Sequence, residues 1–279
     1  MKCFVCGEEM TPYMEKKIAV KYLDGLDTFE YVRCPNCHLV VSKTLYEMSH
    51  EDWAAFNTAA HEDYFKGVLK FEELDPKWLE RLELQAELFV TLLKLGVLKY
   101  DAKTIDYGAG DGKLADKINE KLGRVWLKKF DAYMKPLDEN YLSADEVKPA
   151  SFDFLTSSSV FEHLLGNQGD VDNVIGLIKP DGIMALHTLI CEEVPQDPTW
   201  YYLLPIPVHC TLWTNKAMTL VYKKHCFKGC AYNVESRMWL MFRNVDDFNK
   251  LKENAAQLKG TWQFGDDFVD YWKVKPYRS

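Results

Sequence analysis

The chain has 279 residues, and 47% of them are hydrophobic, which is enough for one large core and a smaller one. Its 42 acidic and 34 basic side chains give a formal net charge of −8, whereas nucleic-acid binding normally requires a basic surface. No apolar run approaches the roughly 20 residues that a bilayer-spanning helix needs. These features argue against a nucleic-acid partner and against a helical membrane protein.

Two Cys-x-x-Cys pairs stand near the start of the chain. They are Cys3 with Cys6 and Cys34 with Cys37, separated by a strand-rich stretch. Four thiolates with this spacing match the tetrahedral coordination of structural zinc. Because a site with four protein ligands has no open position for water, the metal should fold a small zinc ribbon over residues 1–48 and take no part in catalysis.

Other interpretations of the cysteine pairs remain open. Disulfides are one, but the chain starts at Met1 with no apolar secretory segment, so we expect a reducing, cytoplasmic location. A redox dithiol is another, but it would need one pair within a βαβ unit. His38 follows the second pair and is expected to be a bystander. The cysteines expected to be buried free thiols are Cys191, Cys210, Cys226 and Cys230.

Residues 49–100 are predicted to form a helical linker. Ser49 is a suitable N-cap for a helix that runs to about residue 66. A longer helix is predicted to start at Asp75, with Pro76 in its first turn, and to stop at Gly96. These helices should bridge the zinc ribbon and the next domain.

A glycine-rich loop follows a predicted strand at residues 103–105, which Asp106 closes. The loop is Gly108, Ala109, Gly110, Asp111 and Gly112, and a helix is predicted over residues 112–122. Dinucleotide enzymes bind a pyrophosphate with G-x-G-x-x-G, but two carboxylates here would repel one. They suit a ligand with an ammonium group and a sulfonium, which points to S-adenosylmethionine (SAM). The alternative is a simple tight turn between strand and helix.

A second predicted strand, residues 125–130, ends at Asp131, which lies about 20 residues beyond the first glycine. An acidic residue at this distance holds a ribose diol in nucleoside-binding α/β folds. Residues 152–159 are predicted to form a later strand. Because ligands bind at the carboxyl ends of such strands, Ser157 and Ser158 should face the site, unless they only form a turn.

The next predicted elements are a helix that starts at Glu162 and His163, and a strand over residues 183–190 entered by a turn at Pro180. Residues 191–208 are rich in proline and aromatic side chains, and we expect this segment to form a lid over an acceptor pocket or to cover the edge of the sheet. His209 follows it. The remaining predictions are a helix over residues 214–225 with Thr214 as its N-cap, a hairpin over 226–243, and a helix over 246–258 followed by an aromatic tail.

Five segments together resemble the class I SAM-dependent methyltransferases: residues 106–112, 130–133, 151–153, 160–164 and 177–182. The resemblance covers about half the chain and implies an α/β fold, a Rossmann-like sheet of seven strands that are mostly parallel with an antiparallel last strand. It implies a SAM-binding domain over residues 101–245, with a C-terminal helix and aromatic tail over 246–279.

The resemblance also implies roles for single residues. Asp106 and the loop at residues 108–112 would contact the methionine part of SAM, while Asp131 would hold the ribose and Tyr133 would lie on the adenine face. Asp145 is a weaker candidate for the adenine amine. His209 would face the acceptor, and a histidine can take a proton from an acceptor hydroxyl. His163 is the competing general base.

This chain resembles two groups of methyltransferases that have an N-terminal zinc module. One group acts on sugars, glycans and secondary metabolites, and the other methylates guanine in ribosomal RNA. The acidic balance favours a small-molecule or glycan acceptor. A non-catalytic scaffold for protein contacts is a third hypothesis, against which the intact Asp106 and Asp131 argue.

Overall fold

The computed structural model describes residues 1–17, 27–65, 77–167, 169–203 and 208–270. The chain forms two compact units. Unit 1 comprises Met1–Leu74, Phe161–Val171 and Thr188–Val221, and unit 2 comprises Asp75–Val160, Asp172–His187 and Tyr222–Ser279. Each unit has its own sheet. The predicted N-cap Asp75 with Pro76 lies outside the described residues, as do Pro205 and Pro207 of the lid and Tyr271 and Trp272 of the tail.

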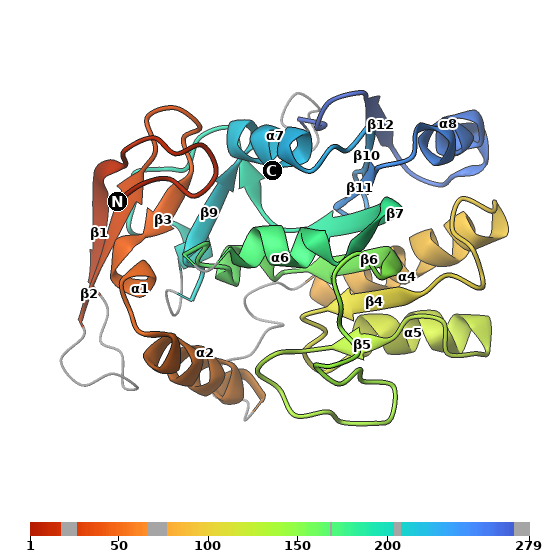
Figure 1. Cartoon of the computed structure of the whole chain (residues 1–279), viewed down its shortest axis with the longest axis horizontal. Coiled ribbons are helices and arrows are strands. Elements are labelled where there is room, and N and C mark those ends of the chain that lie inside the picture. The colour runs from red at the N-terminus through yellow and green to blue at the C-terminus, as the bar shows by residue number, and fades with distance from the viewer. Residues whose placement is uncertain (18–26, 66–76, 168, 204–207, 271–279) are drawn as a thin grey trace. The chain divides into compact units, whose positions relative to one another are not determined.

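Unit 2 contains a sheet of seven strands in the order β12, β10, β11, β7, β6, β4, β5 (Figure 1). The strands are β4 Thr104–Tyr107, β5 Lys129–Phe130, β6 Phe152–Ser158, β7 Ile178–His187, β10 Gly229–Asn233, β11 Met238–Phe242 and β12 Trp262–Gly265. Strands β5, β4, β6 and β7 are parallel, whereas β11 is antiparallel to both β7 and β10, and β12 is antiparallel to β10. The mostly parallel α/β sheet is therefore confirmed.

The core of unit 2 lies between this sheet and three helices, α4 Trp78–Lys94, α5 Lys113–Leu122 and α8 Val245–Glu253. In α5, Leu114 and Ile118 recur at a helical spacing and face the core, while the other side of the helix is charged. Phe89 on α4 packs edge-on against Phe154 of β6, with ring centroids 5.2 Å apart. These contacts fix the strand-to-helix turn that follows β4.

Two predictions for unit 2 need correction. The strand expected at residues 125–130 is only Lys129–Phe130, and Lys129 forms one isolated parallel bridge with Tyr141. The turn expected at Pro180 is an irregularity within β7, because the register with β6 shifts between Ile178 and Ile183. The aromatic tail contributes the edge strand β12, which the sequence analysis did not foresee.

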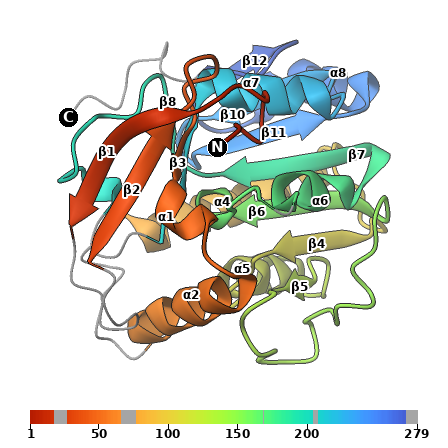
Figure 2. The same ribbon diagram turned by 60° about the vertical axis from the view of Figure 1, so that its left-hand side comes forward.

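Unit 1 contains a sheet of five strands in the order β1, β2, β3, β9, β8. Figure 2 shows its first strands, β1, β2 and β3, beside one another. The strands are β1 Thr11–Lys17, β2 Thr28–Arg33, β3 Val40–Ser42, β8 Ile190–Cys191 and β9 Thr211–Thr214. Strand β9 pairs with β3 through Val40 and Leu212, so the ribbon and a much later segment share one sheet. A core that includes Phe29, Trp53 and Leu203 covers it. The predicted domain boundaries after residues 48, 100 and 245 stay predictions.

The remaining helices are α1 Lys43–Tyr46, α2 His50–Phe65, α6 Asp170–Gly176 and α7 Asn215–Lys224, with 3-10 turns η1 Phe161–His163, η2 Tyr201–Leu203 and η3 Ala255–Gln257. Two predicted caps are confirmed: Ser49 accepts a hydrogen bond from the Asp52 amide, and Thr214 accepts one from the Ala217 amide. The helix expected at Glu162 is a single 3-10 turn. Cys226 is exposed rather than buried. Within the described residues, no helix is long and apolar enough to cross a membrane.

Candidate cofactor and metal sites

The glycine-rich loop in unit 2 turns directly from β4 into α5. Gly108 has a φ of 73°, and a Cβ there would lie 2.4 Å from Cγ2 of Val160, so only glycine fits this close approach. The amides of Gly108 and Ala109 both donate to the Phe130 carbonyl, at 2.8 and 3.0 Å. Gly110 and Gly112 also have positive φ. The loop is thus held against the end of β5.

Asp106 lies at the end of β4 and is only 3% exposed. Burial and, to a smaller extent, the Asp131 charge raise the pKa of its carboxyl to about 7, while Lys129 opposes both. Among the residues that the structure describes, no side chain or amide donates a hydrogen bond to this carboxylate. A buried carboxylate with this environment is costly when ionised, and a cationic ligand would remove that cost.

Asp131 follows β5, and the structure brings it beside the loop. Its Oδ2 accepts a hydrogen bond from the Gly110 amide at 3.0 Å, and its Oδ1 accepts from the amides of Tyr133 and Met134, both at 2.9 Å. The carboxylate is therefore fixed in orientation. Tyr133 is 40% exposed, which leaves ring surface available for stacking.

Lys129 and Tyr141 also hold the glycine-rich loop in place. Neither residue was among the candidates predicted from the sequence. The Lys129 ammonium is fully buried and pairs with Asp116 and Asp138, each at 2.6 Å. The Tyr141 hydroxyl donates to the Gly110 carbonyl at 2.7 Å. A lysine at the end of a strand followed by acidic residues was the only sequence signal for this network.

Ser157 and Ser158 lie at the carboxyl end of β6, the strand that neighbours β4. The hydroxyls of Ser157 and of Thr156, which pairs with Asp106 in register, are buried without a hydrogen-bond partner in the described structure. Unpaired buried hydroxyls cost free energy. Their position beside Asp106 suits polar groups of a ligand.

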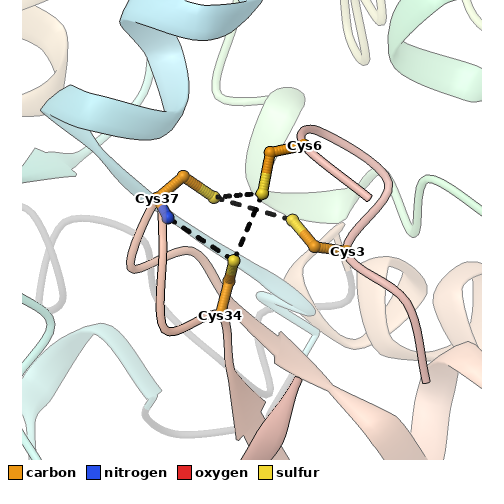
Figure 3. A group of neighbouring side chains, drawn as sticks. All are labelled: Cys3, Cys6, Cys34 and Cys37. Atoms are coloured by element: carbon orange, nitrogen blue, oxygen red, sulfur yellow. Dashed lines mark hydrogen bonds between the residues drawn. The ribbon is translucent and has the colours of Figure 1, made fainter. Parts of the chain in front are cut away.

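The four N-terminal cysteines converge in unit 1 (Figure 3). The Sγ atom of Cys6 lies 3.4 Å from that of Cys34 and 3.8 Å from that of Cys37, and Cys3 lies 3.6 Å from Cys37. Tetrahedral zinc with Zn–S bonds of ~2.3 Å separates its sulfurs by about 3.8 Å. The donor set and its spacing therefore fit this metal.

The two cysteine turns have the same backbone form. The Gly7 amide donates to the Cys3 carbonyl, and the His38 amide donates to the Cys34 carbonyl. Gly7 and His38 both have positive φ, 81° and 63°, so His38 occupies the position that glycine has in the first turn. Its imidazole lies 3.8 Å from Glu193 and is not part of the four-sulfur cluster.

The thiols of the cluster are strongly coupled. The hydrogen bond with Cys37 lowers the pKa of Cys3 to about 5, and the same contact raises the pKa of Cys37. Burial raises the pKa of Cys34. Four thiolates cannot ionise together at these distances without a cation, and a divalent metal would supply the missing charge.

His163 and His209 also meet in unit 1. Their ring centroids are 5.0 Å apart, at an interplanar angle of 71°. The Nδ1 atom of His163 lies 3.1 Å from the Val208 carbonyl, and that of His209 lies 2.6 Å from the Tyr202 carbonyl. The two residues that the sequence offered as competing bases are thus neighbours in one cluster, together with the buried Glu162.

Comparisons with known proteins place the chain in a family. The sequence model of a family described as a methyltransferase domain matches residues 78–228, more than half of the chain. No curated protein sequence matches it.

Solved structures with a similar fold share little sequence with the chain. An O-methyltransferase family protein from Burkholderia thailandensis is 14% identical, with a TM-score of 0.45 over 71% of this chain and 65% of its own. Phosphoethanolamine N-methyltransferase 2 from Haemonchus contortus, solved with SAM, is 15% identical, with a TM-score of 0.40 over 61% of this chain and 42% of its own. A SAM-dependent methyltransferase from Aquifex aeolicus is 16% identical, with a TM-score of 0.38 over 62% of this chain and 97% of its own.

The family assignment rests on the sequence match and on the sheet, and not on these distant structures. The matched residues contain β4 to β7 with the glycine-rich loop and Asp131. The chain belongs to the methyltransferase domain family.

Proposed function

We propose that the protein transfers the methyl group of SAM to a small-molecule or glycan acceptor, at a hydroxyl or carbon of a sugar or nucleotide sugar. The observation that carries the SAM site is the buried Asp106 carboxylate, which has no hydrogen-bond donor among the described residues. The net charge of −8 supports an acceptor other than nucleic acid.

The proposed SAM contacts follow from the geometry of unit 2. Asp106 would balance the cationic part of SAM, and the backbone at Gly108, Ala109, Gly110 and Gly112 would lie against it. Asp131 would accept hydrogen bonds from the ribose hydroxyls, since its carboxylate is already oriented by three amides. Tyr133 would cover the adenine, and Ser157 and Ser158 would contribute hydroxyls.

SAM supplies an activated methyl group, and the protein then has mainly to align the acceptor with it. We propose that the segment 191–213 holds the acceptor and that His209 accepts the acceptor proton. Donation from Nδ1 to the Tyr202 carbonyl would leave the imidazole lone pair on Nε2, as a base requires. His163 has the same arrangement with the Val208 carbonyl and is the alternative.

For Cys3, Cys6, Cys34 and Cys37 we propose a structural Zn²⁺. The spacing of the sulfurs supports it, and the ion would hold both cysteine turns of unit 1. Such sites contribute directly to folding. Chelation should therefore release one equivalent of zinc and melt the five-stranded sheet, measured by circular dichroism; a chelated protein with unchanged strand signal would contradict the proposal.

Calorimetry with SAM and S-adenosylhomocysteine tests the cofactor site, and an absence of heat at high ligand concentration would reject it. The acceptor is tested by incubating the protein with labelled SAM and fractions of a cell extract. We expect label in the small-molecule or glycan fraction. Label in ribosomal RNA, with binding that weakens steeply as salt rises, would favour the RNA alternative. No transfer to any fraction would favour the non-catalytic scaffold.

A further inference from the structure

Glu162, His163 and His209 form a second group of potential metal ligands in unit 1. One ligand atom from each residue lies within 4.8 Å of those of the other two. None of the three belongs to the cysteine cluster. Glu162 is 3% exposed, while the two histidines are half-buried. Zinc bonds to nitrogen and oxygen are ~2.0–2.2 Å long, so small side-chain rotations would bring all three groups onto a single ion.

The surroundings of the three side chains resemble the outer shell of a metal site. Metal-binding histidines usually use their other ring nitrogen to hydrogen-bond a carbonyl or carboxylate. Both imidazoles here have Nδ1 at a backbone carbonyl, which directs Nε2 toward a ligand role. The Glu162 Oε2 atom accepts a hydrogen bond from the Thr188 hydroxyl at 2.7 Å, so the carboxylate is oriented as well.

Tyr202 closes one side of the group. Its ring lies 4.2 Å from the His209 ring, centroid to centroid, at an angle of 38°. Its hydroxyl accepts a hydrogen bond from the Leu189 amide at 3.3 Å. The group is held from three segments of the chain, which is the rigidity that a metal site needs.

We infer that Glu162, His163 and His209 bind a divalent transition-metal ion, with Zn²⁺ as the first candidate. Two imidazoles and one carboxylate form a ligand set used by catalytic zinc and by iron(II). Three protein ligands leave a coordination position open, in contrast to the four cysteines. The two metal sites of unit 1 would then have different tasks, one structural and one open to a ligand.

The role of this ion rests on the proposed function. An acceptor hydroxyl bound at the open position would lose its proton to solvent more readily, because the ion stabilises the alkoxide. The oxygen then forms a bond to the methyl carbon as the bond from that carbon to sulfur breaks and the electron pair stays on sulfur. His163 and His209 would act as metal ligands, and this role would replace the direct proton transfer to an imidazole that is proposed above.

Chain connectivity agrees with this role. Glu162 follows Ser158, the last residue of β6, by four positions, and Thr188 directly follows His187, the last residue of β7. The Ser159 amide donates to the His187 carbonyl at 2.8 Å, so the two strand ends are tied together. Glu162 and Thr188, which belong to unit 1, thus come shortly after these two strands in the sequence.

Cobalt(II) titration of the purified full chain tests the site. Cobalt bound by imidazole and carboxylate shows only d–d absorption, whereas cobalt bound by thiolates adds charge-transfer bands. We expect one equivalent that gives d–d absorption alone. Glu162→Gln and His209→Ala should abolish it, and Thr188→Val should weaken cobalt affinity about 10–100-fold, as loss of an outer-shell partner does.

His225→Gln is the matched control. His225 also has a polar partner, the Asp172 carboxylate at 2.8 Å, but it lies in unit 2 and should leave cobalt binding unchanged. Equal cobalt binding by the wild type and by folded Glu162→Gln would overturn the inference. Cobalt binding without methyl transfer would uphold the site and reject the proposed function. Methyl transfer that does not depend on the metal would uphold the function and reject the role of the ion in it.

Discussion

Replacing Asp106 with asparagine should stabilise the protein above neutral pH while weakening its affinity for SAM. In the folded chain, burial raises the pKa of Asp106 from 3.8 to about 7. The folded state therefore binds a proton more tightly than the unfolded state does. The free energy of unfolding must then fall as pH rises from about 4 to about 7.

The size of this effect follows from the shift. Each pKa unit is worth ~1.4 kcal/mol, so ionised Asp106 costs the folded protein up to about 4 kcal/mol above pH 7. Asparagine resembles the protonated carboxyl in shape and has no charge. Asp106→Asn should therefore match the wild type in stability near pH 4 and exceed it by up to about 4 kcal/mol at pH 8.

Urea unfolding at a series of pH values measures this difference. Asp111→Asn is the matched control, since Asp111 lies in the same loop but is partly exposed and pairs with Lys113 at 2.6 Å. SAM should bind the ionised form, so calorimetry near pH 7 should show proton release that Asp106→Asn abolishes. Identical pH dependence of unfolding in the wild type and Asp106→Asn would refute the reasoning.

Three further outcomes are expected. Asp131→Ala should weaken SAM binding by more than about 10-fold in calorimetry, because a charge-assisted contact is worth about 1.5–3 kcal/mol; unchanged affinity would reject the ribose role. Gly108→Ala should lower the free energy of unfolding by about 1–3 kcal/mol because of Val160, whereas Gly110→Ala, which meets open space, should cost less. His209→Ala should reduce methyl transfer without changing SAM affinity, and normal turnover would argue against any role in the reaction.

The chemistry of the glycine-rich loop could be inferred from local sequence. A strand, an acidic residue and three alternating glycines imply a turn with positive φ and a preference for a cation, and the structure has that turn. Asp131 was found by its distance along the chain. The assigned contacts to SAM stay predictions. Lys129 was missed, because a lysine in a strand shows its buried ion pairs only after Asp116 and Asp138 are brought to it.

The sequence alone does not predict that Glu162, His163 and His209 form one group of potential ligands in unit 1. Glu162 and His163 are adjacent in sequence, but His209 lies in a later segment. Hydrogen bonds from the Thr211 hydroxyl to the Leu164 carbonyl and from the Trp213 indole to the Phe161 carbonyl hold that segment beside them. From the sequence alone, the two histidines are therefore alternatives for a single role as general base. In the structure their ring centroids are only 5.0 Å apart, so the two imidazoles can bind one ligand together.

The sequence by itself determined the features that depend on near neighbours: the two cysteine turns, the helix caps at Ser49 and Thr214, the strand-to-helix loop and the hydrophobic period of α5. Backbone sterics and short-range hydrogen bonds decide these within a few residues. Only the tertiary structure decided the pKa of Asp106, the pairing of β9 with β3 and the meeting of Glu162 with His209. Burial and electrostatic interaction depend on which distant segments pack together, and no local pattern records that.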